Sequence, residues 1–169
     1  MNKAIIIFIV ILIVGGVGGF LILGSNRATP QEKQTNSTTE RRAEGYQGNV
    51  LAGNISPFLE FNKADYEKAK REGKIIILDF YANWCPICRA EAPELHAGFD
   101  ALNNSNVVGF RVNFNDSDTD SDEKALAREF NIPYQHTKVI LKNGVEVSRS
   151  NEQWTKEDLL DAVSEAEQR

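Results

Sequence analysis

The chain has 169 residues, of which 41% are apolar, 25% charged and 9% aromatic. This is the composition of a globular protein, so disorder along the whole chain and a fibrous repeat are both excluded, and the length predicts one domain with an appendage. The net charge of −5 argues against nucleic acid as the main partner. The two cysteines exclude a scaffold held by several disulfide bonds.

Residues 4–23 form an uninterrupted apolar segment without a charged or strongly polar side chain. A helix of this length spans about 30 Å, which is roughly the hydrocarbon thickness of a bilayer. A cleaved signal peptide is the alternative, but its apolar region is usually about 7–15 residues long, and no good small-residue cleavage site follows. We therefore expect an uncleaved transmembrane anchor over residues 1–23.

The segment after this anchor has a different composition. Residues 24–50 are rich in Gln, Ser, Thr and Asn and contain almost no large apolar residues. Such a segment buries too little surface to order itself, so a flexible polar linker is expected. Residues 51–169 are assigned to one folded domain. Gly15 and Gly19 have a spacing that permits close helix packing in membranes, but glycine is common in such spans, so we expect a monomer.

Within the domain, the predicted elements follow one another in an α/β order. A charged amphipathic helix is expected over 62–72, capped by Asn62. The apolar run 74–80 has the length of a central buried strand, and Asn143-Gly144 is a strong hairpin signal. The remaining predictions are helices over 86–102, 122–130 and 155–166, and strands over 107–114, 137–142 and 145–148. This order predicts a three-layer α/β domain with a mixed sheet.

Cys85 and Cys88 open the predicted helix that follows the buried strand, and a Cys-x-x-Cys pair in that position is typical of redox proteins. The first thiol is at the helix N-terminus, where unpaired N–H groups favour a thiolate. Pro86 suits the first helical turn because its missing N–H is not needed there. The sequence therefore predicts Cys85 as the exposed nucleophile and Cys88 as the buried resolving thiol.

Two structural alternatives for this cysteine pair are weaker. A static disulfide that closes so short a loop stabilises little. A zinc site normally has four ligands, but the chain has no second cysteine pair, and its two histidines, His96 and His136, are far apart in the sequence. We therefore expect a redox pair and no metal.

The segment around the cysteines has a wider pattern. Residues 84–88, Trp-Cys-Pro-Ile-Cys, follow Leu-Asp-Phe-Tyr-Ala at residues 78–82. Together they resemble the active-site segment of the thioredoxin superfamily, and the resemblance covers about residues 56–166. It implies a thioredoxin fold and disulfide exchange with protein thiols, without an organic cofactor. The upstream redox partner is then another thiol protein.

The resemblance also implies roles for single residues. Asp79 lies six residues before Cys85, where the family has a buried aspartate that exchanges a proton with the resolving thiol. Burial of a carboxylate is costly and is expected to raise its pKa; the alternative is an aspartate at a strand end that faces water. Trp84 is similar to the family tryptophan beside the disulfide, and with Pro86 and Ile87 it is assigned to the substrate-binding surface.

The family's cis-proline, which faces the disulfide, has no direct counterpart in this sequence. Counting back from Asn143-Gly144 places His136 at that position, whereas Pro133 lies three residues earlier. We expect a trans bond before His136 and its imidazole opposite the disulfide, in the substrate-binding surface. There it would stabilise the Cys85 thiolate or add a ligand for a soft metal. Two alternatives stay open: Pro133 takes the role after a three-residue insertion, or His136 points into solvent.

These observations predict a membrane-tethered thiol–disulfide oxidoreductase. Since cytosolic thioredoxins need no tether, the anchor favours a catalytic domain outside the cytoplasm. The basic residues on the two sides of the span do not decide its orientation. The alternative is a non-catalytic thioredoxin-like module that scaffolds a membrane complex, or that holds a metal through Cys85, Cys88 and His136.

Overall fold

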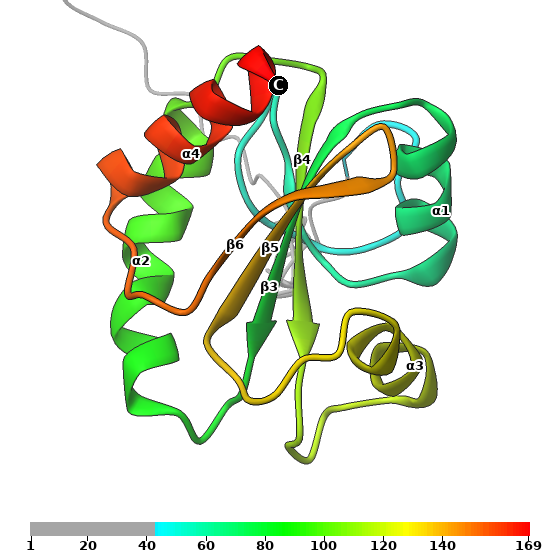
Figure 1. Cartoon of the computed structure of the whole chain (residues 1–169), viewed down its shortest axis with the longest axis vertical. Coiled ribbons are helices and arrows are strands. Elements are labelled where there is room, and N and C mark those ends of the chain that lie inside the picture. Colours follow the sequence, from blue (N-terminus) through cyan, green and yellow to red (C-terminus); the bar gives the residue numbers. More distant parts are fainter. Residues whose placement is uncertain (1–42) are drawn as a thin grey trace, which may run out of the picture. The chain divides into compact units, whose positions relative to one another are not determined.

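A computed structural model describes residues 43–169 of the chain (Figure 1). In this range the chain forms six strands and four helices. In chain order they are β1 (Val50–Ala52), β2 (Phe58–Glu60), α1 (Lys63–Arg71), β3 (Ile75–Tyr81), α2 (Pro86–Ala101), β4 (Val107–Asn113), α3 (Ser121–Glu129), β5 (Thr137–Lys142), β6 (Val145–Ser150) and α4 (Lys156–Gln168). All four helices and the four longer strands were predicted, with ends that differ by one or two residues.

The predicted transmembrane anchor at residues 4–23 lies outside the described residues, as does most of the predicted linker. Within residues 43–169, no helix is both long and apolar enough to cross a membrane. The last part of the predicted linker packs on the domain. The Asp65 carboxylate accepts hydrogen bonds from the backbone N–H groups of Gln47 and Gly48, at 2.7 to 3.0 Å. The folded region therefore begins before residue 51.

The strands form one mixed sheet, as predicted, in the order β1-β2-β4-β3-β5-β6. Its central strand β3 is parallel to β4 and antiparallel to β5. β6 pairs antiparallel to β5 through the turn at Asn143-Gly144, where both residues have the positive φ angles that such a tight hairpin turn requires. At the other edge, β2 is parallel to β4 and β1 is antiparallel to β2; these two short strands were not predicted.

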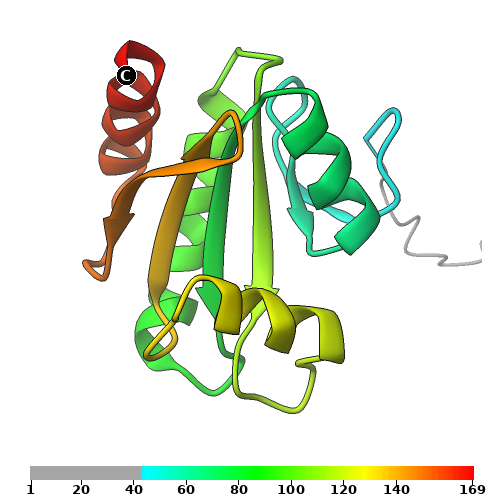
Figure 2. The same cartoon turned by 45° about the vertical axis from the view of Figure 1, so that its right-hand side comes forward.

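Two helices cover each face of the sheet, which gives the predicted three layers (Figures 1 and 2). Ile76, Leu78 and Phe80 of β3 pack in a cluster with residues from α1 and α3. Ile75 and Ile77 point to the opposite side, as successive residues of a strand do, and pack with residues from α2 and α4. We call these two sides the α1/α3 face and the α2/α4 face.

The same alternation directs Asp79 to the α2/α4 face. In the sheet register, Asp79 is paired with Arg111 of β4 and with Lys138 of β5. The α2/α4 face therefore changes from aliphatic to charged at the carboxyl end of β3. This is also the end from which the chain passes into α2.

Candidate active site

The cysteine pair lies where β3 passes into α2. Cys85 directly precedes the first helical residue, Pro86, and its backbone is extended, with φ −77° and ψ 117°. Its Sγ accepts a hydrogen bond from the N–H of Cys88 at 3.2 Å. An N–H donor at the positive end of a helix interacts favourably with negative charge that develops on a sulfur, so this geometry fits the nucleophilic role predicted for Cys85.

Both thiols are free, and both are buried. The prediction of an exposed Cys85 is therefore wrong: only 3% of its surface is exposed. Cys85 and Cys88 form a small cluster with Ala82, against which Tyr81 packs, and these contacts shield the first sulfur from solvent.

Cys88, the predicted resolving thiol, does not ionise readily. Burial raises its pKa to about 12, and a hydrogen bond with Cys85 and the negative charge of Asp79 act in the same direction. A thiol with this pKa has almost no thiolate at neutral pH, and the thiolate is the nucleophile in disulfide exchange. Attack by Cys88 therefore needs a neighbouring group that accepts its proton.

Asp79 has the position and the proton affinity for this task. It is only 5% exposed. Burial raises its pKa to about 7 and the charge of Glu91 adds to this effect, whereas the charges of Lys138 and Arg111 oppose it. A group that titrates near pH 7 can both accept and return a proton at neutral pH. The predicted burial and raised pKa are confirmed, and the alternative of an aspartate facing water is wrong; its role in proton transfer stays a prediction.

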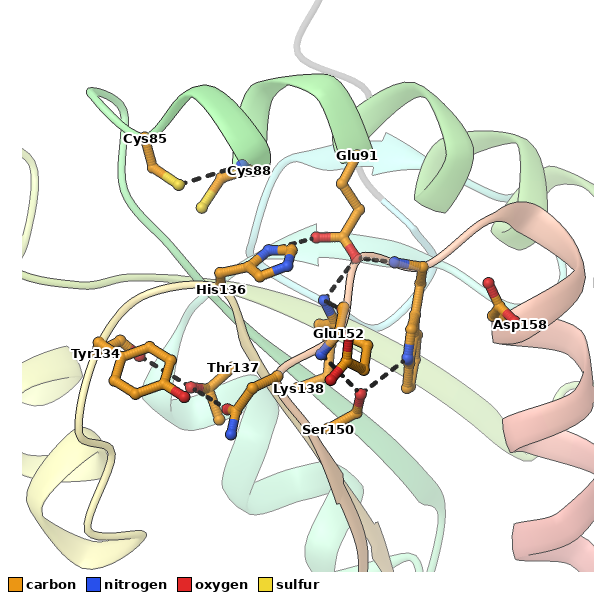
Figure 3. A network of polar contacts seen from close by, with 12 residues as sticks. Cys85, Cys88, Glu91, Tyr134, His136, Thr137, Lys138, Ser150, Glu152 and Asp158 are labelled. Atoms are coloured by element: carbon orange, nitrogen blue, oxygen red, sulfur yellow. Dashed lines mark hydrogen bonds and ion pairs between the residues drawn. The ribbon is translucent and has the colours of Figure 1, made fainter.

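A buried ion pair lies on the same face of the sheet (Figure 3). Lys138 Nζ donates to Glu91 Oε1 at 2.5 Å and to the backbone oxygen of Glu152 at 2.6 Å. Glu91 Oε1 also accepts the backbone N–H of Trp154 at 2.6 Å. Neither charged side chain reaches solvent. Since Glu91 follows Cys88 by three residues on α2, the pair lies one helical turn from the resolving thiol.

Comparisons with known proteins place this chain in a family. The sequence profile of the thioredoxin family matches residues 57–165. The chain belongs to the thioredoxin family. It is 33% identical to thioredoxin H2 of Arabidopsis thaliana over 84 residues, which cover 50% of this chain and 57% of that protein. It is 37% identical to the H-type thioredoxin of Fagopyrum esculentum over 87 residues, which cover 50% of this chain and 66% of that protein.

Solved structures support the same membership. The crystal structure of Trxlp from Edwardsiella tarda EIB202 covers 61% of this chain and 94% of its own, with 30% sequence identity and a TM-score of 0.52. The chain itself spans between 57% and 66% of the length of the two curated thioredoxins named above. The predicted thioredoxin fold with a central mixed sheet is therefore confirmed.

The thioredoxin domain has His136, and not Pro133, directly before β5. His136 adopts a φ of +69°, and its N–H donates to the backbone oxygen of Phe80 at 2.6 Å. The side chain is buried, so the alternative in which it points into solvent is wrong. Burial and the charge of Lys138 lower its pKa. Its Nδ1 lies 3.0 Å from Glu91 Oε2, and the Glu91 carboxylate acts on this pKa in the opposite direction.

His136 therefore contacts α2 one turn beyond Cys88, and Figure 3 shows its ring directed toward Glu91. Its predicted place opposite the two sulfurs stays a prediction. Within residues 43–169, no three Cys, His, Asp or Glu side chains are arranged to hold a metal ion. The metal set suggested above, Cys85, Cys88 and His136, is accordingly not assembled in the described structure.

Three side chains around the cysteines form the exposed part of the site. Trp84 and Ile87 are about half exposed, and Pro86 is exposed as well. The indole Nε1 of Trp84 donates to the backbone oxygen of Asn115 at 3.1 Å, which fixes the ring against the loop after β4. The predicted substrate-binding role of Trp84, Pro86 and Ile87 stays a prediction, and their exposure is compatible with it.

Sequence reasoning missed Glu91 and Lys138. Glu91 lies in a helical segment with several charged residues, so its sequence context resembles a solvent-facing position. Lys138 carried a usable signal, because a lysine inside a strand that pairs with the central strand needs a buried anionic partner. The sequence does not identify Glu91 as this partner, because the two residues are 47 positions apart and only the fold brings them together.

Proposed function

We propose that this chain is a membrane-tethered thiol–disulfide oxidoreductase that exchanges disulfides with protein substrates through Cys85 and Cys88. The observation that carries the proposal is the Cys85 sulfur at the start of α2, which accepts the Cys88 N–H near a buried carboxylate that titrates close to pH 7. Membership of the thioredoxin family supports the same chemistry.

In the reductive direction, the Cys85 thiolate attacks one sulfur of a substrate disulfide. The substrate S–S bond breaks, a mixed disulfide forms, and the displaced thiolate takes up a proton. The Asp79 carboxylate then accepts the proton of Cys88, and the resulting thiolate attacks the sulfur of Cys85. The mixed disulfide breaks, and the second substrate sulfur leaves as a thiolate that takes up a proton. The products are the Cys85–Cys88 disulfide and a substrate with two thiols, so two electrons pass to the substrate.

The reverse sequence oxidises a substrate dithiol. In either direction a second thiol protein must restore the starting redox state of the cysteine pair, because the reaction needs no organic cofactor. The side chains of Trp84, Pro86 and Ile87, next to the cysteines in the sequence, are exposed and are the proposed contact surface for both proteins. We place His136 at the inner edge of this surface, beside α2.

The tether is the second part of the proposal. Residues 4–23 are proposed as a single-pass anchor, because their apolar length matches a bilayer, and the linker lets the domain reach partners near the membrane. We propose that the domain faces the extracytoplasmic side, because a thioredoxin that works in the cytoplasm needs no anchor.

Reduction of insulin disulfides by the complete purified chain, with dithiothreitol as electron source, tests the catalytic part. We expect turnover by the wild type, none by Cys85→Ser, and a trapped mixed disulfide with Cys88→Ser, because that variant retains the nucleophile but lacks the resolving thiol. A wild type as inactive as Cys85→Ser would instead support the non-catalytic scaffold.

Extraction of membranes with alkaline carbonate tests the tether, and trypsin treatment of right-side-out vesicles tests the orientation. We expect the complete chain to stay in the membrane pellet and the domain to be digested from outside. A variant without residues 4–23 should appear in the supernatant. Release of the complete chain by carbonate would exclude the anchor, and protection from trypsin until detergent is added would place the domain on the opposite side.

A further inference from the structure

The ammonium group of Lys138 is enclosed on the α2/α4 face. It has no exposed surface, and its Nζ contacts Glu91 Oε1 and the Glu152 backbone oxygen at 2.5 and 2.6 Å. The ring of Trp154 lies below it, with its centroid 5.4 Å from Nζ. Two acceptors and an aromatic face compensate for much of the lost hydration. These contacts therefore hold the Lys138 side chain at a fixed point inside the protein.

This fixed charge lies beside the proposed proton acceptor. Asp79 and Lys138 are register partners on adjacent antiparallel strands, and both lie on the face where Ile77 and Ile140 pack. Directly opposed residues on one face of an antiparallel pair have Cβ atoms about 4.5–5.5 Å apart. The negative end of the ion pair, Glu91, also acts on Asp79, from α2.

The other charged or titratable groups around Asp79 come from three elements. Arg111 on β4 is held by Glu60, with its Nη2 2.9 Å from Glu60 Oε1. Cys88 and Glu91 belong to α2, and His136, which contacts Glu91, precedes β5. Among these groups, Lys138 and Glu91 are the two that are buried, directly paired with each other and of opposite sign. Their effects on the Asp79 carboxyl therefore oppose each other.

We propose that Lys138 is a positioning residue of the exchange reaction: its enclosed ammonium offsets the charge of Glu91, so that the Asp79 carboxyl can ionise and accept the Cys88 proton near neutral pH. The inference rests on the proposed function. Without Lys138, only Arg111 opposes the charge of Glu91, and the proton stays on Asp79 up to a higher pH. Cys88 then lacks a base in the neutral range, and resolution of the mixed disulfide slows.

The test follows the Asp79 carboxyl carbon by NMR in the complete chain labelled with 13C-aspartate, with Asp79→Asn to assign the signal. We expect Lys138→Met to raise the titration midpoint by about one pH unit or more, and Glu91→Gln to lower it by a similar amount. The double variant should return close to the wild type. Lys142→Met is the matched control, because it makes the same change on β5 away from Asp79, and should not shift the midpoint.

Glu91→Gln retains an oxygen that can accept the Trp154 N–H, so the double variant removes both charges with little loss of hydrogen bonding. If Lys138→Met alone fails to fold, the step from Glu91→Gln to the double variant still isolates the charge of Lys138. That step should raise the midpoint by about one pH unit or more. A shift below about 0.3 pH units, or shifts of the same sign for Lys138→Met and Glu91→Gln, would overturn the proposal.

A second readout separates this inference from the proposed function. The pH at which insulin reduction reaches half its maximal rate should follow the Asp79 midpoint across the variants. If the wild type is active and the Asp79 midpoints move across the variants, but the rate profiles of the variants stay at the pH of the wild type, then Lys138 has no positioning role although the activity stands. If the wild type reduces no insulin, the proposed function fails whatever the titration shows.

Discussion

The two faces of the sheet use the same central strand in different ways. On the α1/α3 face, β3 contributes Ile76, Leu78 and Phe80, and its contacts there are apolar along the whole strand. On the α2/α4 face, Ile75 and Ile77 are followed by Asp79, and the apolar packing gives way to buried charges. The strand therefore stabilises the domain on one side and presents a titratable group on the other.

The difference shows how a small domain can bear buried charges. Asp79, Glu91 and Lys138 are all nearly inaccessible to water, and burial of charged groups is costly unless they are paired. The apolar cluster on the opposite face supplies favourable burial that offsets this cost. The charged end of the α2/α4 face is also the end that carries the cysteines. The unfavourable burial of charged side chains is therefore confined to the candidate active site.

Phe80→Ala tests how much apolar packing on the α1/α3 face contributes to stability. Phe80 is fully buried and meets the ring of Phe114 edge to face. Its loss should lower the free energy of unfolding by about 3–5 kcal/mol, through lost burial and a cavity, by a similar amount at pH 5 and pH 8. Urea denaturation of the complete chain measures this. The exposed Ile55 provides the control, since Ile55→Ala should change the value by less than about 0.5 kcal/mol; equal effects of the two variants would contradict the prediction.

Asp79→Asn tests the charged side. The folded-state pKa of about 7 lies above the ordinary value of 3.8, so the folded protein holds this proton more tightly than the unfolded chain. Its contribution to stability therefore falls as the pH rises from about 4 to about 7. Asparagine does not ionise, so the variant should be more stable than the wild type by up to roughly 4 kcal/mol at pH 8, with a smaller difference at pH 4.

Urea denaturation at the two pH values measures this effect, and insulin reduction at pH 7 should be slower in the same variant. Asp161→Asn is the matched control, because Asp161 lies on the exposed side of α4. It should leave the pH dependence of stability unchanged. An Asp79→Asn variant that loses stability at pH 8 would show that the ionised carboxylate is better solvated than its burial indicates.

The elements of the fold were also unequally predictable from the sequence. The apolar run of β3, the Asn143-Gly144 turn and the cap at Asn62 are local signals, and each appears in the structure as expected. β1 and β2 have three residues each, which is too short for a periodic pattern to show. Their pairing depends on the edge of a sheet that is already formed.

The site was predictable where its chemistry is local. Cys85, Cys88 and Asp79 lie within one strand–loop–helix segment. The position of the cysteine pair predicts its chemistry, and the resemblance to the thioredoxin superfamily implies the place of Asp79. The Glu91–Lys138 pair joins a helix to a distant strand, so no local pattern encodes it. The burial of Cys85 was mispredicted for a related reason: a position at a helix N-terminus indicates electrostatics, whereas exposure depends on the packing of neighbouring side chains.

The smallest expected effect concerns the helices that cover the two faces. Thr155 caps the start of α4, and Asp120 caps the start of α3. In each case the capping side chain accepts an N–H of the first turn, and the carboxylate three positions later accepts the N–H of the capping residue. Thr155→Ala and Asp120→Ala should each lower the free energy of unfolding by about 1 kcal/mol.

Neither should move the Asp79 midpoint, because the charge difference between the faces arises from Lys138 and Glu91 at the sheet and α2. Urea denaturation and the carboxyl titration measure both quantities. A midpoint shift in Thr155→Ala as large as that in Lys138→Met would mean that the position of α4 on the sheet, rather than the Glu91–Lys138 ion pair, controls the titration midpoint of Asp79.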